Sequence, residues 1–351
     1  MQARSELSLV MPGLPGAIAG LDRGEAPPGL KLASLPRLLS RSDVSPVPVR
    51  GFEETLCWLF GIHREAGGDL PVAALTRLAD SGRPAEGFWL RADPVHLRAD
   101  ASRLILFDAT TLVIDAAEAA ALAASFNAFY ADHGWRLEAL HPQRGYLRLP
   151  GPAAIRTSPP SAVRAQHIDP FLPQGADAPF WHRVMNEVQM LFHAHPVNRA
   201  REAAGRPAIN SLWFWGGGAC PAPTAVAWTR VQGGEPLGKG LAALSGVPFE
   251  SGTADAGALD SGALPGPPGE RLVIQDGLAA AVAYSDVEAC MRELARMEAT
   301  WFVPLERALR RGQIGALTLY PCNGRRYRIS RIGLRRFWRR VPPSQVLAAH
   351  D

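Results

Sequence analysis

The chain has 351 residues, of which 47% are hydrophobic and 20% are charged, a balance typical of a globular protein with a core large enough for two lobes. No apolar run reaches the roughly 20 residues of a membrane helix, and the N-terminus shows no leader pattern, so we expect a cytoplasmic protein without a membrane partner. The four cysteines are scattered without C-x-x-C spacing, which predicts neither a zinc site nor a disulfide framework.

The charges are distributed unevenly along the chain. Residues 307–350 hold eleven arginines and neither a lysine nor a carboxylate, whereas residues 1–306 carry 26 basic and 32 acidic side chains. A basic tail on an acidic body usually indicates an acidic partner.

The first half of the chain is expected to form loops followed by a small lobe. Residues 1–50 are rich in proline and glycine, which predicts loops and one short helix at 35–39. Residues 51–150 are expected to form a smaller α+β lobe, and residues 151–175, rich in proline and serine, a linker. The elements predicted in the lobe are helices at 51–62, 70–79 and 116–132 and strands at 88–91, 104–107, 112–114, 136–140 and 146–149.

Residues 176–351 alternate between strand and helix patterns, as the chain of a parallel sheet does. Pro304 lies inside the last predicted helix and is expected to kink it. The predicted fold class is therefore α/β, a mostly parallel sheet with flanking helices, together with the smaller α+β lobe. The predicted elements of this part are strands at 211–215, 225–231, 271–275, 314–320 and 326–330 and helices at 181–195, 236–245 and 286–311.

The organising stretch runs from Trp181 to Pro221. Strand 211–215 is dense in large apolar side chains and leads directly into Gly216–Gly218, here called the glycine turn. We expect this strand to be central in the parallel sheet, with Trp213 and Trp215 on one buried face. The glycine turn would then lie at its carboxyl end, where open α/β sheets bind ligands.

Polar side chains upstream of the strand are candidates for the wall of this crevice. Arg201 can donate two hydrogen bonds to a phosphate or carboxylate, and asparagine side chains can instead hold loop backbone in place. Both interpretations remain open, and a phosphorylated or carboxylate small molecule is the ligand class considered. The candidate ligand-binding residues are Asn198, Arg201, Asn210, Gly216, Gly217 and Gly218.

Histidines and carboxylates give no convincing metal pattern. His193 and His195 are two positions apart, so on one helix they point in nearly opposite directions. Asp93, His96 and Arg98 alternate as any half-exposed strand does. We therefore predict no metal site, no cofactor and no catalytic residue.

The C-terminal arginines form a candidate basic patch with aromatic neighbours, which could bind nucleic acid or an acidic protein. Alternatively the segment is structural. Tyr327, Ile329 and Ile332 then belong to a strand core, and Leu334, Phe337 and Val341 to the buried side of a terminal helix. The arginines of this patch are Arg325, Arg326, Arg328, Arg331, Arg335, Arg336, Arg339 and Arg340.

A family resemblance is carried by residues 195–218, HPVNRAREAAGRPAINSLWFWGGG. The segment resembles archaeal-type, cofactor-independent phosphoglycerate mutases of the alkaline phosphatase superfamily, with their His-Pro-x-Asn, an arginine, Ala-Asn, an apolar strand and a glycine-rich turn. The whole chain is more similar to bacterial RpfE-type regulatory proteins. The resemblance implies a degenerate alkaline-phosphatase-like fold.

The same resemblance implies two metal ions and a serine nucleophile, and the chain departs from that pattern. Strand 7–10 is followed by Met11 where the mutases have an aspartate, and the nucleophile position falls on Phe52–Glu53. A late strand ends at Asp276, and no histidine occurs between His195 and His350. Without those ligands and that hydroxyl neither a dimetal clamp nor a phosphoenzyme can form.

Three functions are therefore predicted. The first is a non-catalytic, phosphoglycerate-mutase-like protein with a binding or regulatory role. The second is an active metal-dependent phosphoglycerate mutase or phosphatase whose ligands are rebuilt from other side chains. The third is a binder of nucleic acid or an acidic protein through the arginine-rich tail. The ligands that the second function could use are Asp93, His96, Asp115, Asp169, His193, Asp255, Asp260 and Asp276.

Overall fold

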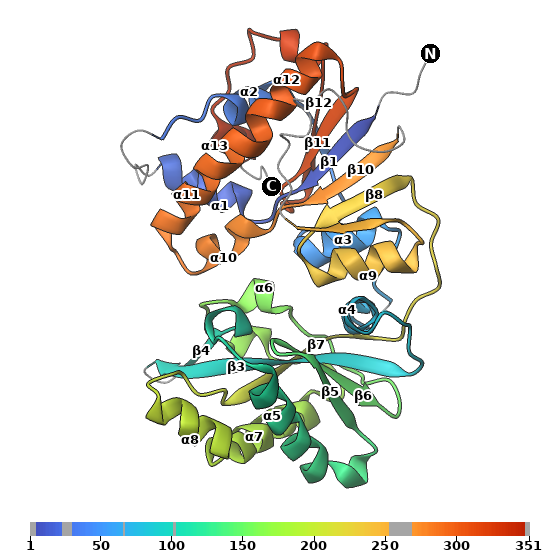
Figure 1. The fold of residues 1–351 in the computed structure, drawn as a ribbon, viewed down its shortest axis with the longest axis vertical. Coiled ribbons are helices and arrows are strands. Elements are labelled where there is room, and N and C mark those ends of the chain that lie inside the picture. Colours follow the sequence, from blue (N-terminus) through green and yellow to red (C-terminus); the bar gives the residue numbers. More distant parts are fainter. Residues whose placement is uncertain (1–4, 23–29, 66, 101–102, 253–268, 348–351) are drawn as a thin grey trace. The chain divides into compact units, whose positions relative to one another are not determined.

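The computed structural model describes residues 5–22, 30–65, 67–100, 103–252 and 269–347. The chain divides into two compact units (Figure 1). The parallel-sheet unit comprises Met1–Gly61 and Thr224–Asp351, and the antiparallel-sheet unit comprises Ile62–Pro223. The chain thus leaves the first unit once and returns to it.

This division differs from the lobes and linker predicted from the sequence. Residues 151–175 do not connect two lobes but belong to the antiparallel-sheet unit, where Arg156 bridges to Gln174 and His167 to Ile105. Proline and serine enrichment indicated irregular backbone correctly, but backbone of that kind can also run across the surface of a unit.

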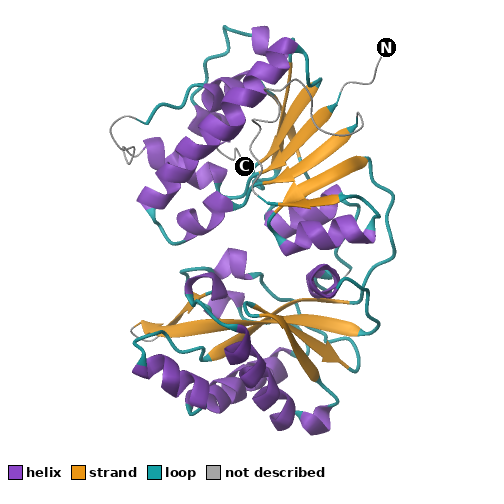
Figure 2. Cartoon of the chain, viewed as in Figure 1, coloured by secondary structure: helices purple, strands orange, loops and turns teal. Residues whose placement is uncertain are grey.

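The parallel-sheet unit contains a seven-stranded sheet in the order β2-β12-β11-β1-β10-β8-β9. Neighbouring strands from β11 to β9 run parallel, and β12 and β2 are antiparallel. Helices flank the sheet (Figure 2), so the α/β class with a mostly parallel sheet is confirmed. The strands are β1 (Glu6–Val10), β2 (Asp43–Pro46), β8 (Trp228–Gly233), β9 (Phe249–Ser251), β10 (Glu270–Ile274), β11 (Ala316–Tyr320) and β12 (Arg325–Ser330).

The N-terminal residues are more ordered than their composition predicted. β1 lies between β10 and β11 at the centre of the sheet, and Leu7 and Leu9 are buried in the core of the unit. Because a central parallel strand is covered on both faces, a short apolar run suffices to form it. The expectation of loops with only one helix is therefore wrong for the described part of residues 1–50, whereas the strand that the resemblance implied at 7–10 is present as β1.

The helices of this unit supply the rest of its core. A π-helical turn at Glu298–Phe302 separates α11 from α12 just before Pro304, where the sequence predicts an irregularity. Proline has no amide to continue the helical ladder, and the wider turn absorbs the interruption. The helices are α1 (Leu14–Asp22), α2 (Ser34–Arg41), α3 (Phe52–Leu59), α9 (Pro236–Leu244), α10 (Gly277–Ala283), α11 (Val287–Met297), α12 (Val303–Arg311) and α13 (Pro343–Leu347).

The antiparallel-sheet unit differs from the predicted α+β lobe at both ends. The predicted helix at 51–62 belongs to the parallel-sheet unit, and residues 151–223 add three helices and one strand. The sheet of the antiparallel-sheet unit runs β4-β3-β6-β5, and β7 pairs with β3. The strand predicted at 112–114 is absent, because a short 3-10 turn at Ala109–Thr111 leads into the start of α5. The other elements are β3 (Phe88–Asp100), β4 (Arg103–Phe107), β5 (Arg136–His141), β6 (Arg144–Leu149), β7 (Ser211–Gly218), α4 (Val72–Ser81), α5 (Ala116–Phe129), α6 (Pro160–Val163), α7 (Ala178–His193) and α8 (Pro196–Ala203).

β7 is the strand that was predicted to be central in the parallel sheet, and that prediction is wrong. It pairs antiparallel with β3, from Trp89↔Gly218 to Val95↔Ser211. The predicted burial is confirmed, because Trp213 and Trp215 are 1% and 6% exposed. Burial on both faces indicates a covered strand, but it does not specify which sheet the strand joins.

The predicted terminal helix over Leu334–Val341 is also wrong. Residues 331–341 form turns, with a short 3-10 helix at Gly333–Arg335. Tyr327 and Leu334 are buried as expected, whereas Ile332 is 75% exposed.

Candidate functional site at the carboxyl edge of the parallel sheet

The glycine turn does not line an open crevice. The Gly216 amide donates to Thr157 Oγ1 at 3.0 Å, and the Gly217 amide faces Asp69 Oδ2 at 3.4 Å. Asp69 also accepts a hydrogen bond from the Thr157 amide at 3.0 Å. A carboxylate of the chain therefore occupies the position that an anionic ligand would need at these amides.

Arg201 is a structural residue. Its side chain is 0% exposed and pairs with Glu118 at 2.8 Å. Nε donates to the Pro207 carbonyl at 2.7 Å, and the terminal nitrogens reach the carbonyls of Leu112 at 2.5 Å and Val113 at 3.4 Å. The guanidinium donors are directed at protein acceptors, which supports the structural interpretation of Arg201.

The two asparagines hold backbone at the opposite end of β7 from the glycine turn. Asn198 donates to the carbonyls of Phe192 and Ile209, each at 2.8 Å, and accepts from the Ile209 amide. Asn210 bonds both the amide and the carbonyl of Leu97. These hydrogen bonds support the structural interpretation of the two side chains.

His195 is not arranged for catalysis. Its Nδ1 accepts the Val197 amide at 3.2 Å, so Nε2 of the neutral ring carries the proton and donates to Ser125 Oγ at 2.9 Å. Burial lowers the pKa of His195, which favours that neutral ring. A ring that donates to the hydroxyl cannot also remove its proton, so this pair is no nucleophile and base.

The carboxylates proposed as rebuilt metal ligands are dispersed. Asp93 is buried against Arg91 at 2.7 Å and accepts from the Trp215 indole at 2.7 Å, and burial raises its pKa. Asp115 caps α5 in a capping box. His96 Nδ1 lies 2.8 Å from the Ala208 carbonyl. Over the described ranges, no three His, Cys, Asp or Glu side chains are placed to bind one metal ion, and Asp255 and Asp260 lie outside those ranges.

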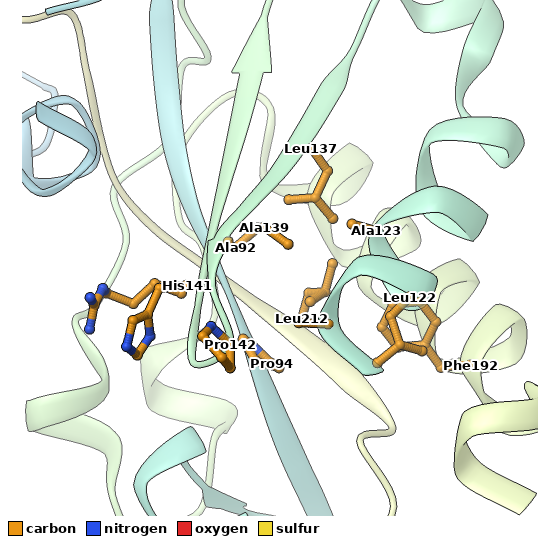
Figure 3. A pocket seen from close by; sticks show the side chains of 13 residues that line it. Ala92, Pro94, Leu122, Ala123, Leu137, Ala139, His141, Pro142, Phe192 and Leu212 are labelled. Carbon is orange, nitrogen blue, oxygen red and sulfur yellow. The ribbon is translucent and has the colours of Figure 1, made fainter. Parts of the chain in front are cut away.

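A small cavity opens beside β3 and α5 in the antiparallel-sheet unit (Figure 3). Its volume of about 20 Å³ is enough for one water molecule. Its surface is almost entirely apolar, with Leu122, Leu137, Phe192 and Leu212 in the lining. A phosphorylated metabolite does not fit here.

The predicted basic patch is only partly available to a ligand. Arg326 and Arg328 lie on β12, where Arg328 pairs with Glu6 at 2.6 Å and Arg326 donates to Ser45 Oγ at 3.0 Å. Both arginines alternate with buried residues along β12, because successive residues of a strand face opposite sides of the sheet. Five arginines of the patch, from Arg331 onward, follow the strand in the turns at 331–341.

The fold itself indicates a different site, which the sequence motifs did not. In open α/β sheets ligands bind at the carboxyl ends of parallel strands. β1 ends at Val10, which is in register with Tyr320 at the end of β11 and Ile274 at the end of β10. β8 continues the row and ends at Gly233.

The residues that follow these strand ends are buried or acidic. Met11 follows β1 and is 1% exposed. Gln275 follows β10 and is tied to β1 through its amide, which donates to the Val10 carbonyl at 2.9 Å. Cys322 follows β11 at a positive φ of 63°, and burial raises the pKa of its thiol to about 12. A protonated thiol is a poor nucleophile and a poor metal ligand.

Carboxylates occupy the N-termini of the helices at this edge. Glu235 caps α9, accepting the Gly238 amide at 2.8 Å. Glu53 and Glu54 lie in the first turn of α3, and Asp276 precedes α10. Burial raises the pKa of Glu235 to about 8, and repulsion by Asp276 and Glu53 adds to the shift.

These carboxylates define the electrostatic character of the edge. A helix N-terminus is the usual binding place for a phosphate, but at α9 a carboxyl group of the chain, that of Glu235, already accepts the amide hydrogen bond. A free phosphomonoester would also be repelled by the acidic neighbours. The sequence signal for Glu235 was present in Glu-Pro at the start of a predicted helix, a combination typical of an N-cap followed by proline.

Comparison with known proteins supports the resemblance over part of the chain. No protein-family model matches. The 2,3-bisphosphoglycerate-independent phosphoglycerate mutase of Methanosarcina mazei is 34% identical over 73 residues, which are 21% of this chain and 18% of that protein. The Methanosarcina acetivorans enzyme is 32% identical over 69 residues, 20% of this chain and 17% of the enzyme. The chain thus matches less than a fifth of the length of these relatives.

Two solved structures align with most of this chain. The PH0037 protein from Pyrococcus horikoshii aligns with a TM-score of 0.50 at 13% identity, covering 94% of this chain and 88% of that one. The cofactor-independent phosphoglycerate mutase from Thermoplasma acidophilum aligns with a TM-score of 0.43 at 16% identity, covering 93% and 90%. The chain is therefore an α/β protein with distant, partial sequence similarity to cofactor-independent phosphoglycerate mutases.

Proposed function

We propose that this protein is a bacterial, cytoplasmic relative of the phosphoglycerate mutases, of the RpfE type, that acts by binding and does not transfer phosphoryl groups. The observation that carries the proposal is the carboxyl edge of the parallel sheet. There the helix N-termini hold the chain's own carboxylates, and Met11 and Cys322 follow two of the central strands.

The chemistry of phosphoryl transfer explains why this edge supports a binding role. A phosphomonoester needs cations around its oxygens and an activated nucleophile on the phosphorus. The resemblance places the nucleophile position at Phe52, which has no hydroxyl, and the Cys322 thiol at this edge is protonated because burial raises its pKa. The phosphorylated or carboxylate ligand suggested by the sequence gains no support here, since its predicted contact Arg201 is fully buried.

The direct test is an activity assay with divalent metals. The purified protein is incubated with 3-phosphoglycerate, and separately with p-nitrophenyl phosphate, in the presence of Mn²⁺, Co²⁺, Mg²⁺ or Zn²⁺. We expect no metal-dependent turnover, whereas the Methanosarcina mazei mutase assayed in parallel serves as the positive control.

Variants decide the interpretation of any activity that is found. Turnover that is lost in Glu53→Gln and Asp276→Asn but kept in Glu288→Gln would overturn the proposal and establish the metal-dependent enzyme instead. Glu288 is a suitable control because it lies on α11 with its side chain 90% exposed. Activity that all three variants retain equally comes from a contaminant and leaves the expected result standing.

A further inference from the structure

The turns at residues 331–341, here called the arginine–aromatic surface, expose apolar side chains to an unusual extent. Phe337 is 65% exposed, Trp338 is 67% exposed and Ile332 is 75% exposed. Phe337 and Trp338 contact each other edge to face, with ring centroids 5.3 Å apart. Exposed aromatic residues that are grouped in this way mark an interaction site more often than isolated ones.

The same segment carries five arginines and has few carboxylates to pair with. Arg336 and Arg339 share Asp43. Arg331 and Arg335 are exposed, and within the described residues neither contacts a carboxylate. The surface therefore presents a net positive charge to a ligand.

The surface is also held in place. Arg339 donates to the Ser42 carbonyl at 3.2 Å, and Arg41 donates to the Leu334 carbonyl at 2.7 Å. These bonds fasten the turns to the end of α2 and the start of β2. Because the segment is anchored, a ligand would not have to order it on binding, which lowers the cost of association.

We propose that the arginine–aromatic surface binds single-stranded nucleic acid, with arginines on the phosphates and Phe337 and Trp338 stacked on bases. Arginine suits this role because its planar fork donates two hydrogen bonds to a phosphate and also stacks on rings. Neighbouring aromatic side chains and cationic groups are the combination that non-sequence-specific single-strand binders use.

The aromatic pair favours single strands over a duplex. Bases in a duplex are already stacked, so exposed rings gain little from it and only the phosphates remain to be contacted. An acidic protein would satisfy the arginines but offers no regular partner for two rings. The proposal is independent of the proposed function, because the surface lies on residues that take no part in the carboxyl edge.

Fluorescence anisotropy with labelled oligonucleotides of about 16 nucleotides tests the proposal on the full chain. Oligo-dT and oligo-U are compared with a duplex of the same length at low and moderate salt. We expect single strands to bind more tightly than the duplex, with affinity falling as salt rises. The preference between oligo-dT and oligo-U then tells whether DNA or RNA is the better ligand.

Two sets of variants separate stacking from charge. Replacing Phe337 and Trp338 together by alanine should weaken single-strand binding by at least about fivefold and leave duplex binding unchanged. Replacing Arg331 and Arg335 together by glutamine should weaken binding to both, and reduce the magnitude of the salt slope for single strands by about 1.4. All four side chains are exposed, so the fold should tolerate the changes, which circular dichroism verifies.

Matched controls come from elsewhere in the chain. Phe129→Ala removes an aromatic ring that is 54% exposed in the antiparallel-sheet unit, and Arg292→Gln removes an exposed arginine of α11. Neither should change binding.

Three outcomes would overturn the proposal. One is equal affinity for single strands and duplex that the aromatic double variant does not alter. Another is the absence of oligonucleotide binding at low salt. The third is binding to phosphatidylserine vesicles without binding to oligonucleotides, which would assign the surface to a membrane.

Discussion

Replacing Arg201 by methionine should destabilise the antiparallel-sheet unit strongly, because this arginine joins separate parts of that unit. Its guanidinium connects α8 to Glu118 of α5 and to the carbonyls of Leu112 and Pro207. Methionine keeps much of the side-chain volume, so the loss reflects polar contacts more than a cavity.

The expected size of the effect follows from burial. Removing one partner of a buried ion pair costs about 3–5 kcal/mol of stability, because the remaining charge is left buried without a counter-charge and without water to solvate it. Glu118 keeps a bond to Arg206 at 2.8 Å, so we expect the lower half of that range. Arg206→Met is the matched control: its side chain is 40% exposed, and exposed pairs contribute about 0–1 kcal/mol.

Urea unfolding followed by tryptophan fluorescence measures both variants, because five of the nine tryptophans belong to Ile62–Pro223. A loss below about 1 kcal/mol for Arg201→Met, or equal losses for the two variants, would refute the structural role argued for Arg201. A ligand role would then regain its place, since binding residues often contribute little to stability or even reduce it.

Three further predictions concern stability. Trp213→Ala removes a buried ring and its hydrogen bond to the Ser158 carbonyl, and should lower the free energy of unfolding by about 3–5 kcal/mol. A stability loss no larger than that caused by replacing an exposed tryptophan would contradict the burial of Trp213. Gly217→Val should lower the free energy of unfolding by about 1–3 kcal/mol in the same urea assay, because a Cβ there would lie 2.9 Å from the Leu90 side chain. Wild-type stability of the variant would show that the Leu90 side chain moves aside without cost. Glu235 binds a proton more tightly in the folded state, with a pKa of about 8 against an ordinary value of 4.5. The contribution of Glu235 to stability is therefore present below about pH 4.5 and is lost as pH rises towards 8. Glu235→Gln should remove this decline in stability. If the variant kept the wild-type pH profile of the thermal midpoint, Glu235 would not be the group responsible.

The sequence was sufficient for most local structure and for burial. Alternating strand and helix patterns predicted the parallel sheet, and Pro304 marked the interruption between α11 and α12. The apolar stretch at Trp213 predicted a strand buried on both faces. These features depend on periodicity and on the chemistry of single residues, both of which can be read without knowing what lies across the chain.

The local sequence of a strand did not determine which other strand it pairs with. β7 resembles a central parallel strand in composition, yet it pairs with β3 within the antiparallel-sheet unit, because any covered strand has the same apolar signature. β1 was implied by the family resemblance alone, because the proline and glycine around it indicate loops, and its place at the centre of the larger sheet was not predicted. Which strands meet depends on contacts between distant segments, which a local pattern does not encode.

The candidate site shows the same limit. Asn198, Arg201 and Asn210 are the polar types that bind ligands, and only their acceptors in the folded chain identify them as structural. Glu53, Glu235 and Asp276 are widely separated in sequence, and the tertiary structure alone brings their charges within range of one another. The sequence determined which groups can ionise or donate hydrogen bonds, and the fold decided which of them meet, because electrostatic and hydrogen-bonding energies depend on distance and burial.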